Sequence, residues 1–308
     1  MTDVTGLPLP AELATRAREI LAGRAEPVPT RDAATVVILR GSAVAWTEER
    51  RERSDRSDEG RRRLPSDRAR LHGVEAMNAA PEVYLLRRKS TMAFAAGAYV
   101  FPGGSVDARD TDQAVAWAGP SPAEWGAVFN AGEEVARGLV CAAVRETFEE
   151  SGVLLAGPGP DSVVADTTGD DWESDRLALI DRSLGFADFL ARRGLVLRSD
   201  LLKPWAHWIT PEIEHRRFDT RFFAAVLPEG QRTRDVGGEA DHVVWQRPAE
   251  AIELAHKGEI FLMPPTYQTL TELSAHDSVA GILAERREIV PIMPRAVEIE
   301  GEMRLVTR

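Results

Sequence analysis

Three glutamates stand at positions where an α-helix would carry them on one face: Glu146, Glu149 and Glu150. At about 100° per residue, positions i+3 and i+4 lie beside position i, while Val144 and Phe148 project from the opposite face. Carboxylates at this spacing repel one another, and a hard divalent cation such as Mg²⁺ would relieve the repulsion because it prefers oxygen ligands. A solvated acidic face is the alternative interpretation of this pattern taken alone.

Two adjacent glycines, Gly103 and Gly104, follow an apolar, strand-like stretch that ends at Phe101. Glycine permits positive φ and lets a ligand approach the backbone, so a turn here would offer a bare carbonyl oxygen to a metal. Downstream, Gly152 is a natural left-handed cap for the helix that carries the glutamates. The sequence therefore predicts a ligand-facing glycine turn in addition to a carboxylate helix.

Hydrophobic periodicity predicts the elements that must position these residues. The expected helices cover residues 10–22, 139–152, 175–192 and 248–257, and the expected strands cover residues 33–39, 82–86, 205–210, 217–227 and 243–245. Helices and strands alternate irregularly in this order. We therefore expect an α/β fold with helices on two faces of a sheet, rather than a regular parallel barrel.

Composition and charge restrict the class of protein. The chain has 308 residues, 44% of them hydrophobic and 28% charged, as in ordinary globular proteins. Asp plus Glu total 49 against 38 for Lys plus Arg, and the net charge of −11 disfavours non-specific binding to nucleic acid. The single cysteine, Cys141, cannot form an internal disulfide and is expected to be a small core residue. With no run of 18 apolar residues and no apolar leader, we expect a cytoplasmic protein without a membrane partner.

The glycine turn and the glutamate helix together resemble the signature of the Nudix hydrolase family. That signature begins with a glycine, continues through an early glutamate to R-E-U-x-E-E-x-G-U, and has a bulky aliphatic residue at each U. The matching residues are Gly104, Arg145, Glu146, Phe148, Glu149, Glu150, Gly152 and Val153, with an aromatic ring at the first U. Asp110 replaces the early glutamate, and 34 residues separate it from Arg145, far more than in the ordinary signature.

The interrupted signature resembles the coenzyme A diphosphatase branch of this family. The insertion holds Trp117, Trp125 and Phe129, and it either folds over the site or packs as a lid. Similarity to this branch continues in residues 90–94, 208–211, 217–223 and 262–266. The resemblance implies a Nudix-type α/β/α sandwich around a mixed sheet, with added N- and C-terminal helices and insertions.

The same resemblance divides the chain into a Nudix domain and two extensions. The domain is expected at residues 31–275, between an N-terminal helical extension at 1–30 and a C-terminal extension at 276–308. Residues 111–136 form the insertion within the signature. Residues 48–70 form a second insertion, with seven acidic and nine basic residues, which we expect to be flexible because it cannot bury enough apolar surface. It is either a solvated hairpin insertion or an arm that contacts substrate phosphate or RNA.

A metal site and catalytic roles are also implied by the resemblance. The implied ligands of Mg²⁺ or Mn²⁺ are Glu146, Glu149, Glu150 and the carbonyl oxygen of Gly104. Arg145 would orient the glutamates through charge-assisted hydrogen bonds. Glu149 and Arg145 are thus expected to act in catalysis together with Glu239, a later acidic residue that would serve as metal ligand or general base. A polar turn is the alternative interpretation of residues 237–241.

The implied reaction is the metal-dependent hydrolysis of a diphosphate bond in a small nucleotide-type substrate. Coenzyme A or acyl-coenzyme A is the leading substrate, giving 3′,5′-ADP and (acyl-)4′-phosphopantetheine, and a homodimer is a further expectation. Guanidinium groups match phosphate geometry, so the 3′-phosphate is assigned to Arg216, Arg217 and Arg221, with ordinary surface solvation as the alternative. The alternative functions are hydrolysis of NADH, ADP-ribose or a damaged nucleotide, and a non-catalytic nucleotide-sensing module.

Overall fold

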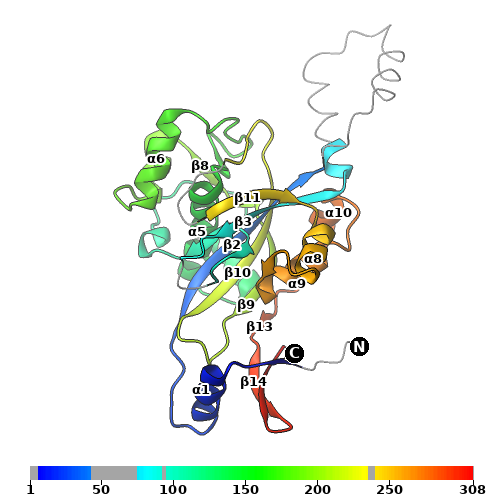
Figure 1. Cartoon of the computed structure of the whole chain (residues 1–308). Coiled ribbons are helices and arrows are strands. Elements are labelled where there is room, and N and C mark those ends of the chain that lie inside the picture. The colour runs from blue at the N-terminus through cyan, green and yellow to red at the C-terminus, as the bar shows by residue number, and fades with distance from the viewer. Residues whose placement is uncertain (1–5, 43–74, 92–94, 235–239, 308) are drawn as a thin grey trace, which may run out of the picture. The chain divides into compact units, whose positions relative to one another are not determined.

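The computed structural model describes residues 6–42, 75–91, 95–234 and 240–307 (Figure 1). The chain divides into two compact units: the first comprises residues 1–36, 103–223 and 287–308, and the second comprises residues 37–102 and 224–286. Within the described ranges, no helix is long and apolar enough to cross a membrane. The insertion predicted at 48–70 lies outside the described residues.

The main sheet of the first unit has the strand order β2-β10-β9-β13, and β5 pairs with the start of β2. Its strands are β2 (Thr30–Gly41, residues 30–36 in this unit), β5 (Gly103–Ser105), β9 (Lys203–Ile209), β10 (Arg217–Val226, residues 217–223 in this unit) and β13 (Pro291–Ile292). β5 runs antiparallel to β2, with Gly104 opposite Ala34, whereas β13 runs parallel to β9. This sheet is therefore mixed, as predicted.

Most helices of the first unit come between β5 and β9 in the sequence. The helices are α1 (Ala11–Leu21), α4 (Pro122–Phe129), α5 (Glu133–Ser151), α6 (Asp170–Ile180) and α7 (Phe186–Arg193), with short 3₁₀ turns η1 (Ala108–Thr111) and η2 (Ser199–Leu201). Helix α5 is anchored in the core because Leu139, Val140 and Val144 are completely buried. It ends at Gly152, whose φ of 75° gives the predicted left-handed cap.

Two small three-stranded sheets complete the first unit. In one, β1 (Leu7–Pro8) and β14 (Arg295–Ile299) flank β15 (Glu302–Val306), and a cluster around Ala17 and Met303 joins α1 to this sheet. In the other, β6 (Trp117–Ala118) and β7 (Ala156–Gly157) flank β8 (Val196–Arg198). The insertion within the signature is therefore tied into the fold by strand pairing.

The second unit has the strand order β12-β4-β3-β2, with β11 also paired to β3. Its strands are the end of β2 (residues 37–41), β3 (Pro81–Arg88), β4 (Ala98–Val100), β11 (Ala240–Gln246) and β12 (Phe261–Leu262). Its helices are α8 (Pro248–His256), α9 (Pro264–Leu273) and α10 (Val279–Ala284). Helices α8 and α9 both begin with proline, whose fixed φ suits the first helical position.

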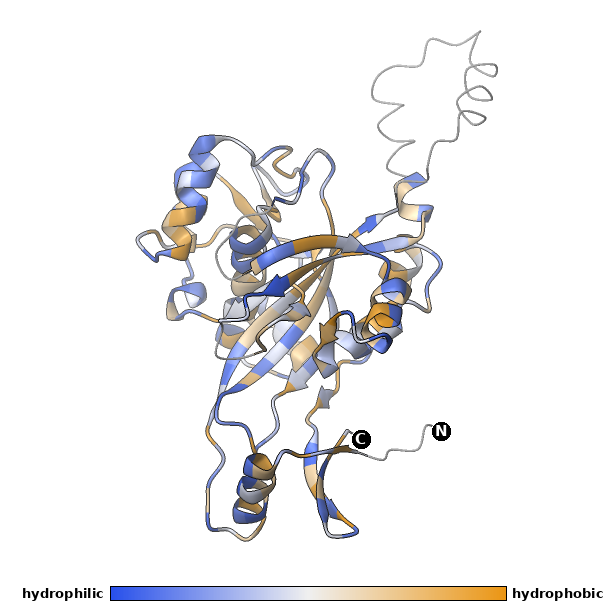
Figure 2. Ribbon diagram, in the orientation of Figure 1, coloured by the Kyte–Doolittle hydropathy of each residue, from blue (hydrophilic) through white to orange (hydrophobic). Residues whose placement is uncertain are grey.

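The α/β class is confirmed, but one predicted helix is divided. Residues 175–192 belong to two helices, α6 and α7, because Arg182 adopts a left-handed φ of 65° and Gly185 begins the second helix as its N-cap. Leu179 and Phe186 are buried on either side of the break, which is why hydrophobic periodicity predicts one continuous helix. Figure 2 shows apolar residues along the strands and mixed hydropathy on α1 and α6, as expected for half-buried helices.

Candidate active site

The C-terminal half of α5 carries the three glutamates of the signature on the face opposite its core contacts. Phe148 is completely buried and stacks on Phe189, with 5.4 Å between the ring centroids. On the other face, only 14% of the Glu146 side chain and 10% of the Glu149 side chain are exposed. Glu150 accepts a 2.8 Å hydrogen bond from the Gly103 N–H. The helix and the glycine segment therefore meet, as the signature predicts.

Arg145 is the centre of a charged network that joins the two halves of the signature. Its Nη1 donates to Glu146 at 2.7 Å and to Glu149 at 3.2 Å. Its Nε and Nη2 donate to both carboxylate oxygens of Asp110, at 2.9 and 2.8 Å, and Nη2 also donates to the Ser105 carbonyl oxygen at 3.1 Å. The bidentate geometry is the strong form of an arginine–carboxylate pair. Asp110 thus lies beside the glutamate helix despite its 35-residue separation from Arg145.

The electrostatics of this network show an excess of buried negative charge. Burial raises the pKa of Glu146 to about 7, although the Arg145 guanidinium partly opposes the shift. Burial likewise raises the pKa of Glu149, again against the effect of Arg145. Burial disfavours the charge of Arg145 itself, but the hydrogen bond to Asp110 and the neighbouring carboxylates outweigh it and raise the pKa of Arg145. One guanidinium is therefore shared by three carboxyl groups.

Gly104 has a different structural role from the one the sequence predicts. Gly103 and Gly104 form part of strand β5, and neither has a positive φ, so they do not make a left-handed turn. A Cβ atom at Gly104 would lie 2.4 Å from Oε1 of Glu146, closer than any side-chain carbon can approach. Glycine leaves the Glu146 carboxylate in its place, whereas a larger residue would displace the end of that side chain. The predicted turn is wrong, and the role of the Gly104 carbonyl as a metal ligand stays a prediction.

The donor set fits a hard divalent cation in its chemistry. Glu146, Glu149, Glu150 and the Gly104 carbonyl all offer oxygen, which Mg²⁺ and Mn²⁺ prefer. In the part of the chain that the structure describes, however, no three His, Cys, Asp or Glu side chains converge as a ready metal cluster. The reason is local: Arg145 holds Glu146 and Glu149, while Glu150 turns to the Gly103 N–H.

The insertion within the signature packs into the core of the first unit. Trp125 and Phe129 of α4 are each 3% exposed, and both rings contact Phe223 of β10, at centroid distances of 5.5 and 5.3 Å. Ahead of α4, Asp107 and Asp110 form a capping box that begins η1. This short turn fixes Asp110 where Arg145 reaches it.

The three arginines assigned to a substrate phosphate differ in their surroundings. Arg217 is buried and donates to the carbonyl oxygens of Thr210 and Val28, at 3.1 and 2.8 Å. Arg221 is buried and pairs with Asp219 at 2.7 Å and with Asp32 at 2.9 Å.

Arg216 is the exposed member of the three. Glu239 lies outside the described residues.

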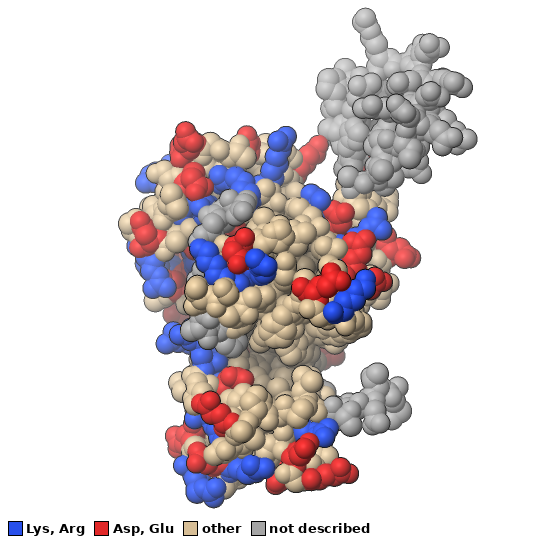
Figure 3. Space-filling view, in the orientation of Figure 1, with Lys and Arg blue, Asp and Glu red and all other residues tan. Residues whose placement is uncertain are grey.

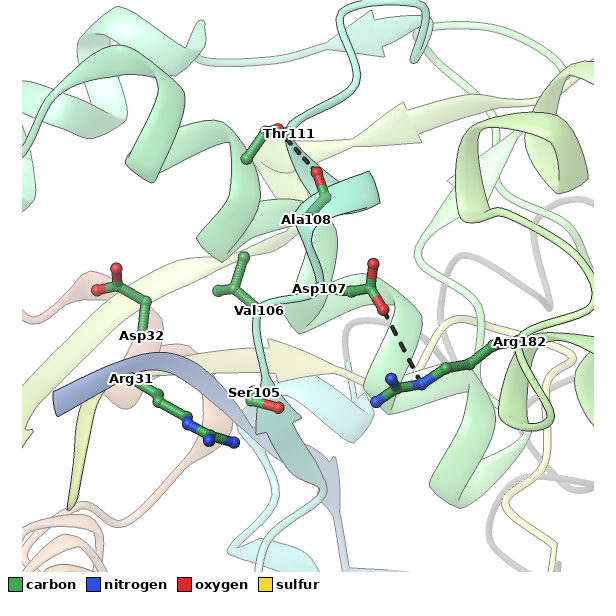
Figure 4. A pocket seen from close by; sticks show the side chains of 8 residues that line it. All are labelled: Arg31, Asp32, Ser105, Val106, Asp107, Ala108, Thr111 and Arg182. Atoms are coloured by element: carbon green, nitrogen blue, oxygen red, sulfur yellow. Dashed lines mark hydrogen bonds and ion pairs between the residues drawn. The ribbon is translucent and has the colours of Figure 1, made fainter. Parts of the chain in front are cut away.

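Sequence reasoning missed two features beside the signature. Arg176 of α6 is 2% exposed and donates from Nη1 to the Glu149 carbonyl oxygen at 2.7 Å, while it pairs with Glu173 at i−3. In the sequence, the i,i+3 spacing of Glu173 and Arg176 is the only local pattern that indicates a partner for this arginine. The second feature is a pocket of about 580 Å³ next to β5 (Figure 4). Its lining residues are Arg31, Asp32, Ser105, Val106, Asp107, Ala108, Thr111 and Arg182.

Comparisons with known proteins show which proteins this chain resembles. A sequence model of the NUDT19 Nudix domain matches residues 129–273. The acyl-coenzyme A diphosphatase NUDT19 of Xenopus laevis is 28% identical over 235 residues, covering 62% of this chain and 59% of that protein. The protein of the same name from Homo sapiens is 30% identical over 237 residues, covering 64% and 62%. Putative nudix hydrolase 7 of Caenorhabditis elegans is 29% identical over 240 residues, covering 74% and 68%.

A solved structure supports the fold. The crystal structure of a Nudix hydrolase from Alicyclobacillus acidocaldarius matches with a TM-score of 0.63 and 24% identity, covering 85% of this chain and 98% of that one. The fold matches that of a Nudix hydrolase, and the sequence model and the relatives that match carry the same family name. The sequence model and two of the relatives are of the NUDT19 type, which is the type that this chain resembles. The matches span less than two thirds of the length of the NUDT19 relatives named above.

Proposed function

We propose that this protein hydrolyses the diphosphate bond of coenzyme A or an acyl-coenzyme A, giving 3′,5′-ADP and (acyl-)4′-phosphopantetheine, with Mg²⁺ or Mn²⁺ as its cation. The observation that carries the proposal is the hydrogen-bonded network in which Arg145 binds Asp110, Glu146 and Glu149. Three of these four residues belong to the second half of the signature. The similarity to relatives named acyl-coenzyme A diphosphatases supports the substrate class.

The chain's own residues have distinct roles in this proposal. Glu146, Glu149, Glu150 and the Gly104 carbonyl would hold the divalent cation. Such a cation, when bound, neutralises the charge of a diphosphate and makes a water molecule more acidic. Arg145 orients the Glu146 and Glu149 carboxylates through Nη1 and is itself fixed by Asp110.

Proton transfer is assigned to Glu149 in this proposal. Its raised pKa makes the carboxylate a better proton acceptor near neutral pH than an ordinary glutamate. Glu239 is the second candidate for this role. Among the arginines, Arg217 and Arg221 are assigned to holding β10 and its neighbours, and Arg216 stays a candidate for substrate contact.

Two variants on α5 and a matched control test the proposal. Glu149→Gln and Glu150→Gln each remove one charge from the site without altering the buried face of the helix, so we expect turnover to fall on the order of 10²-fold or more. Glu134→Gln makes the same change in an exposed residue of the first turn of α5 and should keep wild-type turnover. Thermal unfolding of all three variants checks that the fold is intact.

The substrate is tested with a panel of coenzyme A, acyl-coenzyme A, NADH and ADP-ribose, assayed with Mg²⁺ and with Mn²⁺. We expect coenzyme A compounds to give the highest kcat/KM. Faster cleavage of ADP-ribose or NADH would reject the substrate class but keep the chemistry. Wild-type rates in both α5 glutamine variants at saturating Mg²⁺ would reject the assignment of the metal site.

A further inference from the structure

The pocket beside β5 begins one residue from the glycine of the signature. Ser105 and Val106 line it, while Gly104 contacts Glu146 on the glutamate helix. The Ser105 carbonyl oxygen accepts a hydrogen bond from Arg145, so the same strand borders both the pocket and the charged network. A ligand that reached both the glutamates and the pocket would lie along β5.

The acidic residues of the pocket wall are already paired with arginines outside the lining. Asp107 is bonded to Arg109, with 3.1 Å between Oδ1 and Nε, and this partner lowers the pKa of Asp107 to about 2. Asp32 is paired with Arg221 at 2.9 Å. Both carboxylates thus have their main partners outside the lining, and the contact of Asp107 with Arg182 is longer, at 3.9 Å.

The two cations of the lining are Arg31 of β2 and Arg182 of the turn after α6. In Figure 4 their side chains point toward one another from opposite sides of Ser105. Within the described ranges, Arg31 has no side-chain hydrogen bond or ion pair, and Arg182 has only a long contact of 3.9 Å to Asp107. Two guanidinium groups with unused donors therefore face one open space.

The backbone of Arg182 holds this residue in an unusual conformation. Its φ of 65° is uncommon for a residue with a side chain. Its carbonyl oxygen accepts a 3.1 Å hydrogen bond from Arg109, the residue that neutralises Asp107. Glycine would fit this turn without strain, so Arg182 can be replaced by glycine without disturbing the backbone.

We propose that Arg31 and Arg182 form a binding site for a phosphate monoester of the substrate, separate from the diphosphate that is cleaved. Guanidinium groups bind phosphate through paired, charge-assisted hydrogen bonds, and two of them match a doubly charged group. The 3′-phosphate of coenzyme A is the group of this chemistry in the proposed substrate. The inference rests on the proposed function and moves this contact from Arg217 and Arg221, which are buried and internally paired, to the pocket.

The test measures binding and turnover separately. Binding of 3′,5′-ADP and of 5′-AMP, which lacks the 3′-phosphate, is measured by calorimetry with Mg²⁺ present. Turnover is compared for coenzyme A and dephospho-coenzyme A. The variants are Arg31→Ala and Arg182→Gly, the latter chosen because glycine suits the left-handed turn. Arg24→Ala, an exposed arginine outside the pocket, is the matched control, and Arg216→Ala tests the rival arginine.

In the wild-type protein we expect 3′,5′-ADP to bind roughly ten-fold or more tightly than 5′-AMP, and coenzyme A to be preferred over dephospho-coenzyme A by a similar factor. Arg31→Ala and Arg182→Gly should each reduce both preferences several-fold, and the double variant should abolish them. Arg31→Lys should restore part of the preference because it keeps the charge but not the paired geometry. Arg24→Ala should behave as wild type, and Arg216→Ala should keep both preferences for the 3′-phosphate.

Failure of this inference can be told apart from failure of the proposed function. If no coenzyme A compound is cleaved, the proposed function is wrong. The calorimetric comparison of 3′,5′-ADP with 5′-AMP then still tests whether the pocket binds the 3′-phosphate. If coenzyme A is cleaved but the pocket variants keep the full preference, or Arg216→Ala removes it, the pocket is not the phosphate site. An equal affinity of the wild-type protein for 3′,5′-ADP and 5′-AMP would also overturn it.

Discussion

At the scale of single residues, Gly104 shows how tightly the backbone approaches the acidic network. A methyl group at this position would overlap the Glu146 carboxylate, so Gly104→Ala must push Glu146 away or displace β5. We expect the Mg²⁺ concentration for half-maximal activity to rise roughly 10–100-fold, as when groups that support metal ligands are disturbed. A Mg²⁺ titration of activity measures this. Gly132→Ala is the control, because a Cβ there meets open space, and an unchanged titration in Gly104→Ala would contradict the role given to this glycine.

Cys141 supports a second prediction at this scale. It is completely buried in α5, and burial raises the pKa of its thiol to about 12. At pH 8 only roughly one thiol in ten thousand would be ionised, so the native protein should not react with an aromatic disulfide reagent, whereas protein unfolded in guanidinium should react at once. Because the folded-state pKa is raised, this group favours folding below about pH 8.5 and ceases to do so as the pH rises toward 12.

At the scale of elements, the insertion within the signature is a structural part of the first unit. Trp125→Ala would leave a large cavity between α4 and β10, so we expect a loss of about 3–5 kcal/mol in the free energy of unfolding. Val128→Ala on the same helix removes a side chain that is 41% exposed and should cost far less. Chemical denaturation of both variants measures the difference. Equal stability of the two would mean that α4 is only a loosely attached cover.

The elements also show how far sequence patterns predict this site. The face of α5 follows from the spacing of its glutamates and apolar residues, since both depend only on helix geometry. The neighbourhood of Asp110 and Arg145 could be expected only through the family resemblance, because no local rule relates residues 35 apart. The pocket could not be predicted, since Arg31 and Arg182 come from distant segments and an isolated arginine carries no signal. The division of α6 from α7 was missed because hydrophobic periodicity continues through the turn.

At the scale of the whole molecule, the acidic net charge does not produce a surface of one sign. Figure 3 shows acidic and basic side chains intermixed on the face drawn. The candidate phosphate site therefore depends on a local pair of arginines rather than on the overall field. An anionic substrate would reach it through short-range contacts, and salt should weaken binding only moderately.

The segment between β2 and β3 supports a prediction for the whole chain. Its ends are held together, because Gly41 lies opposite Pro81 and the Ser42 N–H donates to the Ala80 carbonyl oxygen at 2.8 Å. Replacing residues 48–70 by a short glycine–serine turn should leave stability within about 1 kcal/mol and kcat/KM nearly unchanged, since loop length has a small entropic cost. Unfolding curves and steady-state kinetics test this. A large rise in KM with a weaker salt dependence would instead identify a phosphate-binding arm.

The buried thiol of α5 has a practical consequence for the molecule as a whole. The sequence has one cysteine, and it is completely buried, so thiol-reactive labels should not modify the native protein. A cysteine introduced at Ser183, an exposed neighbour of Arg182, would carry a fluorophore on its own. Its emission would report the arrival and departure of a nucleotide in real time, without any need to remove the native cysteine first.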